Sequence, residues 1–143
     1  MRIGLLNGGG DCPGLNAVTH GVVGAAGNLG WEVVGFRDGF EGMLTPANFQ
    51  ILDPLETIGI QKLGGTILGT TNKGRFSGKV GAGGVRKIPS ELMDEARNNL
   101  KELDVKALIC VGGDGTLTTA LQFSEEGFPV IGVPKTKIGR AHV

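Results

Sequence analysis

The sequence has 143 residues, a formal net charge of zero and no long block of like charge. A chain of this length is sufficient for one domain with its own core, and its charge gives no sign of a nucleic-acid tether or a membrane-surface patch. No apolar run reaches the roughly 20 residues of a membrane span, and nothing at the start resembles a signal peptide. We therefore expect a cytoplasmic protein with neither nucleic acid nor membrane as a partner.

The first part of the chain predicts a βαβ unit. Residues 2–6 form a short apolar run that is typical of a buried strand. Pro13 suits the first turn of a helix, apolar residues then recur at helical spacing, and Gly30 fits the position just after a helix end. Residues 31–36 form the next strand, and the crossover between the two strands should be right-handed.

The middle of the chain is less regular. Residues 49–52 are a candidate strand, and residues 54–61 are a candidate helix that Gly59 weakens. Residues 64–84 are rich in glycine and are expected to be mostly loop.

Helices and strands alternate again in the last part of the chain. Ser90 fits the N-cap of a helix that extends to about residue 103. Residues 105–111 form a continuously apolar strand, followed by a loop at 112–115, a helix at 116–126 and a strand at 129–133. This order indicates an α/β fold, with a doubly wound, mostly parallel, Rossmann-like sheet and helices on both of its faces.

The segment Val-Gly-Gly-Asp-Gly-Thr at residues 111–116 directly follows the 105–111 strand. Its glycines remove every Cβ that would hold the main chain away from a ligand, and Asp114 places a carboxylate among backbone N–H groups. A polyphosphate with its divalent metal needs this combination, because amides bind phosphate oxygens and the carboxylate holds the metal. In isolation, the same string also fits a simple tight turn.

Glycine-rich turns follow apolar runs at two further places, residues 7–14 and, more weakly, residues 64–69. The carboxyl ends of parallel strands share one edge of a sheet, which is where ligands bind in such folds. We therefore expect the 7–14 turn, the 111–116 segment and the end of the 129–133 strand to line one phosphate-binding crevice.

Several other residues have both a structural and a functional interpretation. Asp11 fits a cap of the first helix as well as a ligand contact. Cys12 and Cys110 fall near the mouths of the glycine turns and are interpreted as reduced thiols, and His20 is interpreted as a structural residue of the first helix. A loose group of cations fits a solvated face or a phosphate contact: Lys73, Arg75, Arg86 and Lys87.

Four blocks, in this order, resemble the amino-terminal part of the 6-phosphofructokinase family. They are Gly-Gly-Gly-Asp-Cys-Pro-Gly-Leu-Asn-Ala at 8–17, Gly-Gly-Thr-Ile-Leu-Gly-Thr at 64–70, Val-Gly-Gly-Asp-Gly-Thr at 111–116 and Gly-Val-Pro-Lys-Thr at 132–136. The resemblance covers residues 1–136 and implies a partial phosphoryl-donor-binding domain, the first of two domains in the enzyme. The string Gly-Gly-Asp-Gly-Thr alone also occurs in kinases of nicotinamide nucleotides and of lipids, which are the weaker alternative.

The resemblance implies transfer of a phosphoryl group from ATP to the 1-hydroxyl of fructose 6-phosphate in glycolysis, with Mg²⁺, by a homo-oligomeric enzyme (dimer or tetramer). It implies that Gly10 contacts the donor phosphates and that Thr136 lies beside the sugar phosphate. Asp114 matches the metal ligand. The residues that match the loop around donor and metal are Gly113, Asp114, Gly115 and Thr116.

Two positions bear on the phosphoryl donor. Pyrophosphate-using relatives commonly carry an aspartate at the position of Gly115, which blocks the space of a nucleotide α-phosphate, so Gly115 favours ATP. They also tend to carry a lysine at the position of Lys135, a flexible cation suited to the charge of the transition state. The chain therefore resembles the mixed-substrate group of the family, with ATP as the favoured donor and pyrophosphate as the alternative.

The chain departs from the family pattern at two internal places. Many relatives have an arginine at the position of Asn72, and Lys73 is a candidate to supply that charge to the donor. Two arginines that bind an effector in some bacterial relatives correspond to His20 and Gly24, so effector control of that type is not expected.

The last residues depart further. The family continues after Thr136 with Ile-Asp-Asn-Asp, whose first aspartate is the general base, whereas residues 137–143 read Lys-Ile-Gly-Arg-Ala-His-Val. One nucleotide sequence that could encode this segment resembles a common sequencing-library adapter. We therefore expect residues 137–143 to be a non-native tail, the general base to be absent from this chain, and the isolated chain to be an inactive fragment that at most binds phosphate or nucleotide.

Overall fold

The structure is a computed structural model that describes residues 1–9, 14–70 and 88–135. Within these residues, five strands form one sheet in the order β3-β2-β1-β4-β5, in which β3 runs antiparallel to β2 and the other pairs are parallel. All of the predicted strands are confirmed to within two residues. The elements in chain order are β1 (Arg2–Asn7), α1 (Leu15–Asn28), β2 (Glu32–Phe36), the 3₁₀ helix η1 (Gly39–Met43), β3 (Phe49–Leu52), the 3₁₀ helix η2 (Ile60–Lys62), α2 (Ser90–Glu102), β4 (Ala107–Gly112), α3 (Asp114–Glu125) and β5 (Val130–Pro134).

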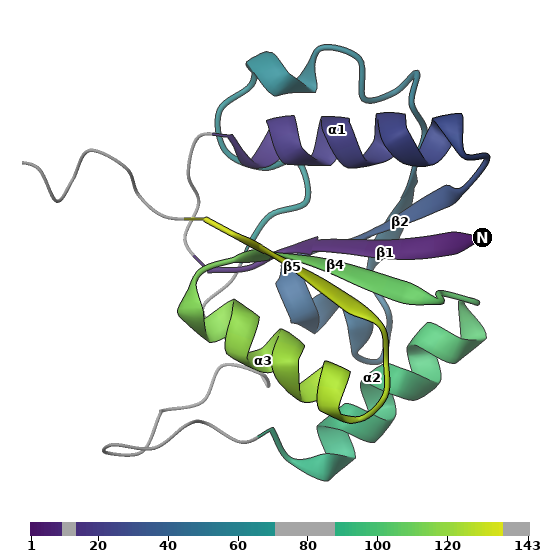
Figure 1. Cartoon of the computed structure of the whole chain (residues 1–143), viewed down its shortest axis with the longest axis vertical. Coiled ribbons are helices and arrows are strands. Elements are labelled where there is room, and N and C mark those ends of the chain that lie inside the picture. The colour runs from purple at the N-terminus through teal and green to yellow at the C-terminus, as the bar shows by residue number, and fades with distance from the viewer. Residues whose placement is uncertain (10–13, 71–87, 136–143) are drawn as a thin grey trace, which may run out of the picture.

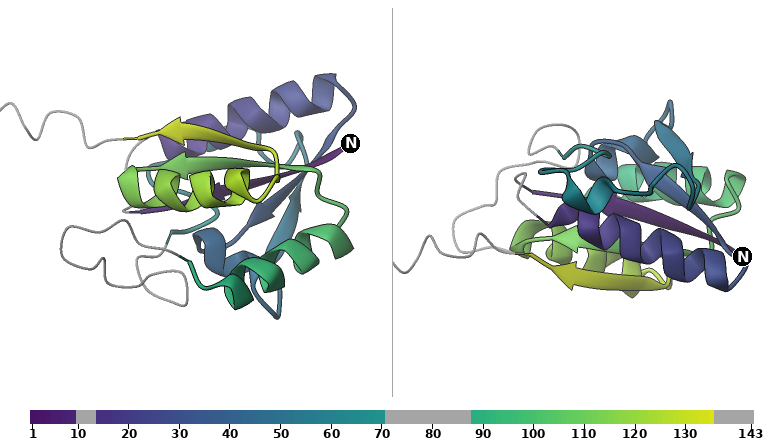
Figure 2. Two further views of the ribbon diagram at one scale, coloured as in Figure 1. Left: turned by 60° about the horizontal axis from the view of Figure 1, so that its bottom comes forward. Right: turned by 90° about the horizontal axis from the view of Figure 1, so that it is seen from above.

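Helices cover both faces of the sheet, as the doubly wound prediction requires. α1 lies on one face with η2 beside it, and α2, α3 and η1 lie on the other face (Figures 1 and 2). Two apolar clusters fill the spaces between the layers. In one, Phe36 and Leu108 of the sheet share a cluster with Phe123 of α3, and in the other Leu5 of β1 shares a cluster with Leu15 of α1. None of the helices in the described ranges is long and apolar enough to cross a membrane.

Cys110 lies within β4 and is fully buried in the cluster beneath α2 and α3, so its predicted place at the mouth of a glycine turn is wrong. Side chains alternate between the faces of a strand, and position 110 faces the core rather than the strand end. Burial raises the pKa of the Cys110 thiol to about 12. The side chain therefore stays a neutral thiol near pH 7 and packs like a small apolar group. Cys12 lies outside the described residues.

The predicted helix at 54–61 is wrong. Residues 54–59 form turns, and only the short η2 follows them. Gly59 has a left-handed φ of 84°, and the Asp53 carboxylate accepts a hydrogen bond from the Leu55 N–H at 2.7 Å, a local bond that favours a turn over a helix. His20 Nδ1 lies 3.1 Å from the carbonyl oxygen of Thr57, so this side chain joins α1 to the turns, in agreement with its structural interpretation.

The start of α2 also differs from the prediction. Ser90 is the first residue of the helix, and Pro89 is the N-cap. Pro89 has φ −55° and ψ 138°, so it already provides the extended geometry that an N-cap requires. Among the described residues, no side-chain hydrogen bond caps this end.

Gly42 packs directly against neighbouring main chain, so a side chain there should be destabilising. A Cβ atom on Gly42 would lie 2.7 Å from the Asn48 carbonyl oxygen and 2.8 Å from the Arg37 nitrogen. We expect Gly42→Ala to lower the free energy of unfolding by about 1–3 kcal/mol in urea denaturation. Gly21→Ala in α1 is the control, because no atom lies within 4 Å of that Cβ position, and it should stabilise by about 0.5–1 kcal/mol. Unchanged stability of Gly42→Ala would contradict this packing.

Candidate phosphate-binding site

The carboxyl ends of β1, β4 and β5 meet at one edge of the sheet, as the sequence predicts (Figure 1). Asn7 pairs with Val111 at the end of β1 and β4, and Gly112 pairs with Pro134 at the end of β4 and β5. The bonds continue beyond the strands, because the Gly8 N–H donates to the Val111 carbonyl at 2.8 Å and the Lys135 N–H donates to the Gly112 carbonyl at 3.0 Å. Gly8, Gly113 and Lys135 are therefore neighbours in space.

α3 begins directly at the glycine-aspartate segment. β4 extends through Gly112 and α3 starts at Asp114, so the predicted loop at 112–115 is reduced to Gly113. The strand pairs with β5 up to its last residue, which leaves a single residue for the turn into the helix. Asp114 and Gly115 are exposed.

The amino end of α3 offers unpaired amide donors. The first intrahelical bond joins the Leu117 N–H to the Gly113 carbonyl at 2.9 Å, which leaves the N–H groups of Asp114, Gly115 and Thr116 without an intrahelical partner. In the part of the chain that the structure describes, no side chain caps this end. Aligned peptide dipoles add a partial positive charge there, so the helix start is suited to bind an anion.

Thr116 lies beneath this helix start rather than at its surface. Its side chain is 9% exposed and occupies the space where a Cβ atom on Gly8 or on Gly112 would lie. Both glycines are therefore needed because Thr116 fills the gap between the ends of β1 and β4. A ligand can reach the Thr116 N–H, but the side chain serves to pack the two strand ends together.

Lys135 folds toward the first glycine turn. A Cβ atom on Gly9 would lie 3.3 Å from Lys135 Nζ and 4.0 Å from the Gly113 nitrogen. Gly9 also has a left-handed φ of 77°, which favours glycine. A cation and two bare stretches of main chain thus converge where the strand ends meet. The sequence indicated Lys135 and Gly10; it did not assign Gly9, although the run of three glycines was the available signal.

The third glycine turn, residues 63–69, lies beside the first. Asn7 Nδ2 donates a hydrogen bond to Thr66 Oγ1 at 2.5 Å, and Asn16 in the first turn of α1 bonds to main-chain groups of the same segment. Both asparagines are buried. Sequence reasoning missed them, although a lone amide within an apolar strand or helix was a usable signal.

Several residues with a role or a candidate role from the sequence lie outside the described residues: Gly10, Asp11, Lys73, Arg75, Arg86, Lys87 and Thr136. Their roles stay predictions. In the described ranges, no group of three or more His, Cys, Asp or Glu side chains could hold a metal ion. Asp114 nevertheless fits Mg²⁺, because it is exposed at the helix start beside free amides, and Mg²⁺ in phosphate sites commonly uses one carboxylate together with waters and phosphate oxygens.

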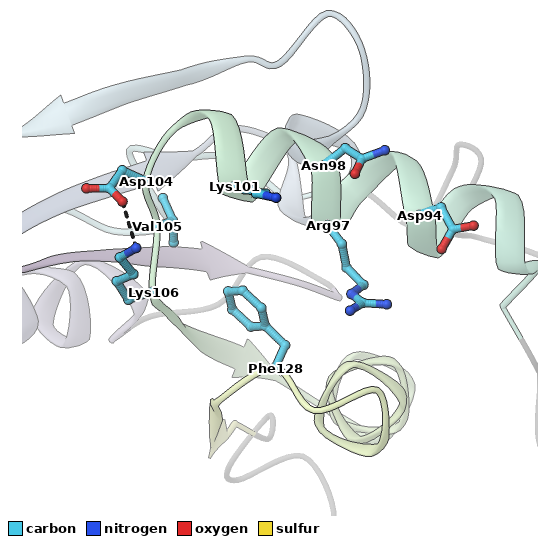
Figure 3. Close-up of a pocket in the computed structure, with 8 residues that line it drawn as sticks. All are labelled: Asp94, Arg97, Asn98, Lys101, Asp104, Val105, Lys106 and Phe128. Atoms are coloured by element: carbon cyan, nitrogen blue, oxygen red, sulfur yellow. Dashed lines mark ion pairs between the residues drawn. The ribbon is translucent and has the colours of Figure 1, made fainter.

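A separate groove of about 530 Å³ lies at the opposite end of the sheet, between α2 and the segments that enter β4 and β5 (Figure 3). Its charges are largely paired within the protein: Lys106 Nζ lies 2.8 Å from Asp104 Oδ1, and Arg97 lies 3.6 Å from Glu126. The hydrogen bond from Lys106 lowers the pKa of the Asp104 carboxyl. This groove is therefore not part of the phosphate-binding site.

The fold matches that of solved phosphofructokinases. The phosphofructokinase of Saccharomyces cerevisiae superposes with a TM-score of 0.80 at 24% identity, over 94% of this chain and 20% of that chain. The pyrophosphate-dependent phosphofructokinase of Nitrosospira multiformis gives a TM-score of 0.72 at 21% identity, over 94% of this chain and 33% of that chain.

Sequence comparison gives closer relatives. The chain is 46% identical over 142 residues to the ATP-dependent 6-phosphofructokinase of Chloroflexus aggregans. It is 45% identical over 138 residues to the pyrophosphate–fructose 6-phosphate 1-phosphotransferase of Amycolatopsis methanolica. Each alignment covers 95% of this chain and 37% of the relative, so the chain spans somewhat more than a third of their length. The family model for phosphofructokinase matches residues 2–137, and the chain therefore belongs to the phosphofructokinase family.

Proposed function

We propose that this chain forms the phosphoryl-donor side of a 6-phosphofructokinase that transfers a phosphoryl group from ATP to the 1-hydroxyl of fructose 6-phosphate. The observation that carries the proposal is the meeting of the uncapped start of α3 with Gly9 and Lys135 at the ends of three parallel strands. Family membership and the activities in the names of the relatives support the same reaction.

The residues of the site have distinct roles in this proposal. The N–H groups of Asp114, Gly115 and Thr116 bind donor phosphate oxygens, and Lys135 offsets the negative charge that shifts during transfer. Asp114 would hold Mg²⁺, which supplies further charge neutralisation when it is bound. Gly10 and Lys73 are further proposed contacts to the donor, and Thr136 is a proposed contact to the sugar phosphate. These three assignments rest on the family resemblance.

Pyrophosphate is the second candidate donor, and Lys135 is the observation that favours it. Its Nζ lies 3.3 Å from the Cβ position of Gly9, where it can bind a compact, highly charged donor without any nucleotide contact. One relative is named for pyrophosphate as donor. Gly115 favours ATP, because no described atom outside the helix backbone lies within 4 Å of its Cβ position.

The proposed setting is a homo-oligomer in the cytoplasm. Ile131 on the edge strand β5 is 62% exposed, and Leu29 at the end of α1 is 61% exposed. An apolar groove near α1 includes Ile3, Val22 and Ile109. Such exposed apolar surface is typical of a contact with further protein.

Lys135→Ala tests where the donor binds. We expect the variant to bind Mg-pyrophosphate about tenfold more weakly than the unmodified chain in calorimetric titration, because one charge-assisted contact is lost. Lys101→Ala is the matched control, since Lys101 lines the groove at the opposite end of the sheet (Figure 3). It should leave the affinity unchanged. Binding that is insensitive to Lys135, or that is lost in Lys101→Ala, would contradict the proposed site.

A further inference from the structure

Asn16 connects α1 to the glycine-rich 63–69 turn through its side chain. It lies in the first turn of α1 and is 1% exposed. Its Oδ1 accepts a hydrogen bond from the Ile67 N–H at 2.7 Å. Its Nδ2 lies 3.3 Å from the carbonyl oxygen of Leu63 and 3.4 Å from that of Gly64. One amide group thus binds the start of the turn and its middle.

Two other elements hold the same turn from the side of the strand ends. Asn7, the last residue of β1, donates to Thr66 Oγ1 at 2.5 Å, and Thr66 Oγ1 also accepts from the Leu68 N–H at 3.0 Å. The Asp38 N–H, just after β2, donates to the Leu68 carbonyl at 3.0 Å. The turn is therefore tied both to Asn7, the first residue of the 7–14 glycine turn, and to the segment that follows β2.

Such anchoring matters because the turn is rich in glycine. Glycine loses more conformational freedom on folding than any other residue, so a segment with Gly64, Gly65 and Gly69 needs specific bonds to keep one geometry. Gly65 and Gly69 have left-handed φ values of 74° and 75°. A side-chain amide suits this role, because it donates and accepts hydrogen bonds at once.

We propose that Asn16 is a positioning residue, which fixes the 63–69 turn against the end of β1 and thereby sets the affinity of the site for a polyphosphate. The inference rests on the proposed function and deepens it. Asn16 itself does not touch the ligand; it acts through Ile67, Leu63 and Gly64, whose main chain it binds.

Asn16→Leu tests the inference, because leucine branches at Cγ as asparagine does and makes none of the three bonds. We expect the Ile67 amide to exchange its hydrogen about tenfold faster and the Kd for Mg-tripolyphosphate to rise about threefold to tenfold. Asn16→Asp keeps the acceptor for the Ile67 N–H but loses the donor to the Leu63 and Gly64 carbonyls, so it should protect Ile67 better than Asn16→Leu does and give an intermediate Kd. Asn28→Leu, at the exposed far end of α1, is the control and should change neither quantity.

Four outcomes would overturn the inference. One is a released Ile67 amide with unchanged affinity in Asn16→Leu, which would make the position of the turn irrelevant to binding. Another is faster exchange throughout α1 and β1, which would give Asn16 a general role in stability. Failure of the unmodified chain to bind Mg-tripolyphosphate would overturn the proposed function as well, and normal binding by every variant would overturn this inference alone.

Discussion

Gly115→Asp is expected to weaken Mg-ATP binding by about tenfold to a hundredfold while Mg-pyrophosphate binding stays within about threefold of the unmodified chain. The resemblance to the phosphofructokinase family implies that position 115 faces the space of the nucleotide α-phosphate. Pyrophosphate has only two phosphates and lacks a counterpart to this one. A carboxylate there would occupy that space and repel the phosphate. The shorter donor would avoid most of this conflict.

The structure makes this substitution a clean test. Among the described residues, no atom outside the helix backbone lies within 4 Å of the Cβ position of Gly115, which is exposed, so a Cβ atom there meets no steric conflict with them. An acidic residue in the first turn of α3 also interacts favourably with the helix dipole. The stability of the variant should therefore match or exceed that of the unmodified chain, and a change in affinity can be assigned to the ligand.

Gly115→Ala is the control, because it adds a side chain without the charge. Calorimetric titration of both variants with the two donors measures the effect. If Gly115→Asp weakens both donors equally, the carboxylate acts on the shared phosphates and position 115 does not distinguish them. If it weakens neither, the start of α3 is not where the donor binds.

The strands were predictable from sequence because they are short and mainly apolar runs: β1, β2 and β4 are buried over most of their length, and the edge strands β3 and β5 are partly exposed. β4, for example, is bounded by the polar Lys106 and by Gly113, and its interior is apolar. The shared edge of the sheet followed from topology, since parallel strands end on the same side. The predictable part of the site is accordingly its main chain: the glycine turns and the start of α3.

Side-chain partners were not predictable in the same way. Asn7 and Asn16 both bind the 63–69 turn, which lies about 50 positions further along the chain. Only the packed fold brings these residues together. Thr116 is predicted to contact the donor, and that contact stays a proposal through its N–H; that its side chain packs against Gly8 and Gly112 could not be read from the sequence. The helix predicted at 54–61 failed because the bond from Leu55 to Asp53 outweighed weak helix propensity.

Asp114→Asn should abolish most of the Mg²⁺ dependence of polyphosphate binding. Asp114 is exposed in the first turn of α3, and asparagine has the same shape but lacks the charge that a hard cation requires. With Mg²⁺ present, we expect tripolyphosphate to bind about tenfold to a hundredfold more weakly than in the unmodified chain. Without Mg²⁺, the variant should bind at least as tightly, because a negative charge that repels the anion has been removed.

The opposite response in the two conditions is what identifies a metal ligand. A substitution that merely disturbed α3 would weaken binding both with and without Mg²⁺. Glu125→Gln, at the exposed far end of the same helix, removes the same charge and should alter neither affinity. Titration with and without Mg²⁺ measures all three proteins on one scale. Equal Mg²⁺ enhancement in Asp114→Asn and in the unmodified chain would exclude Asp114 as the metal ligand and leave the amides of α3 and Lys135 as the basis of the site.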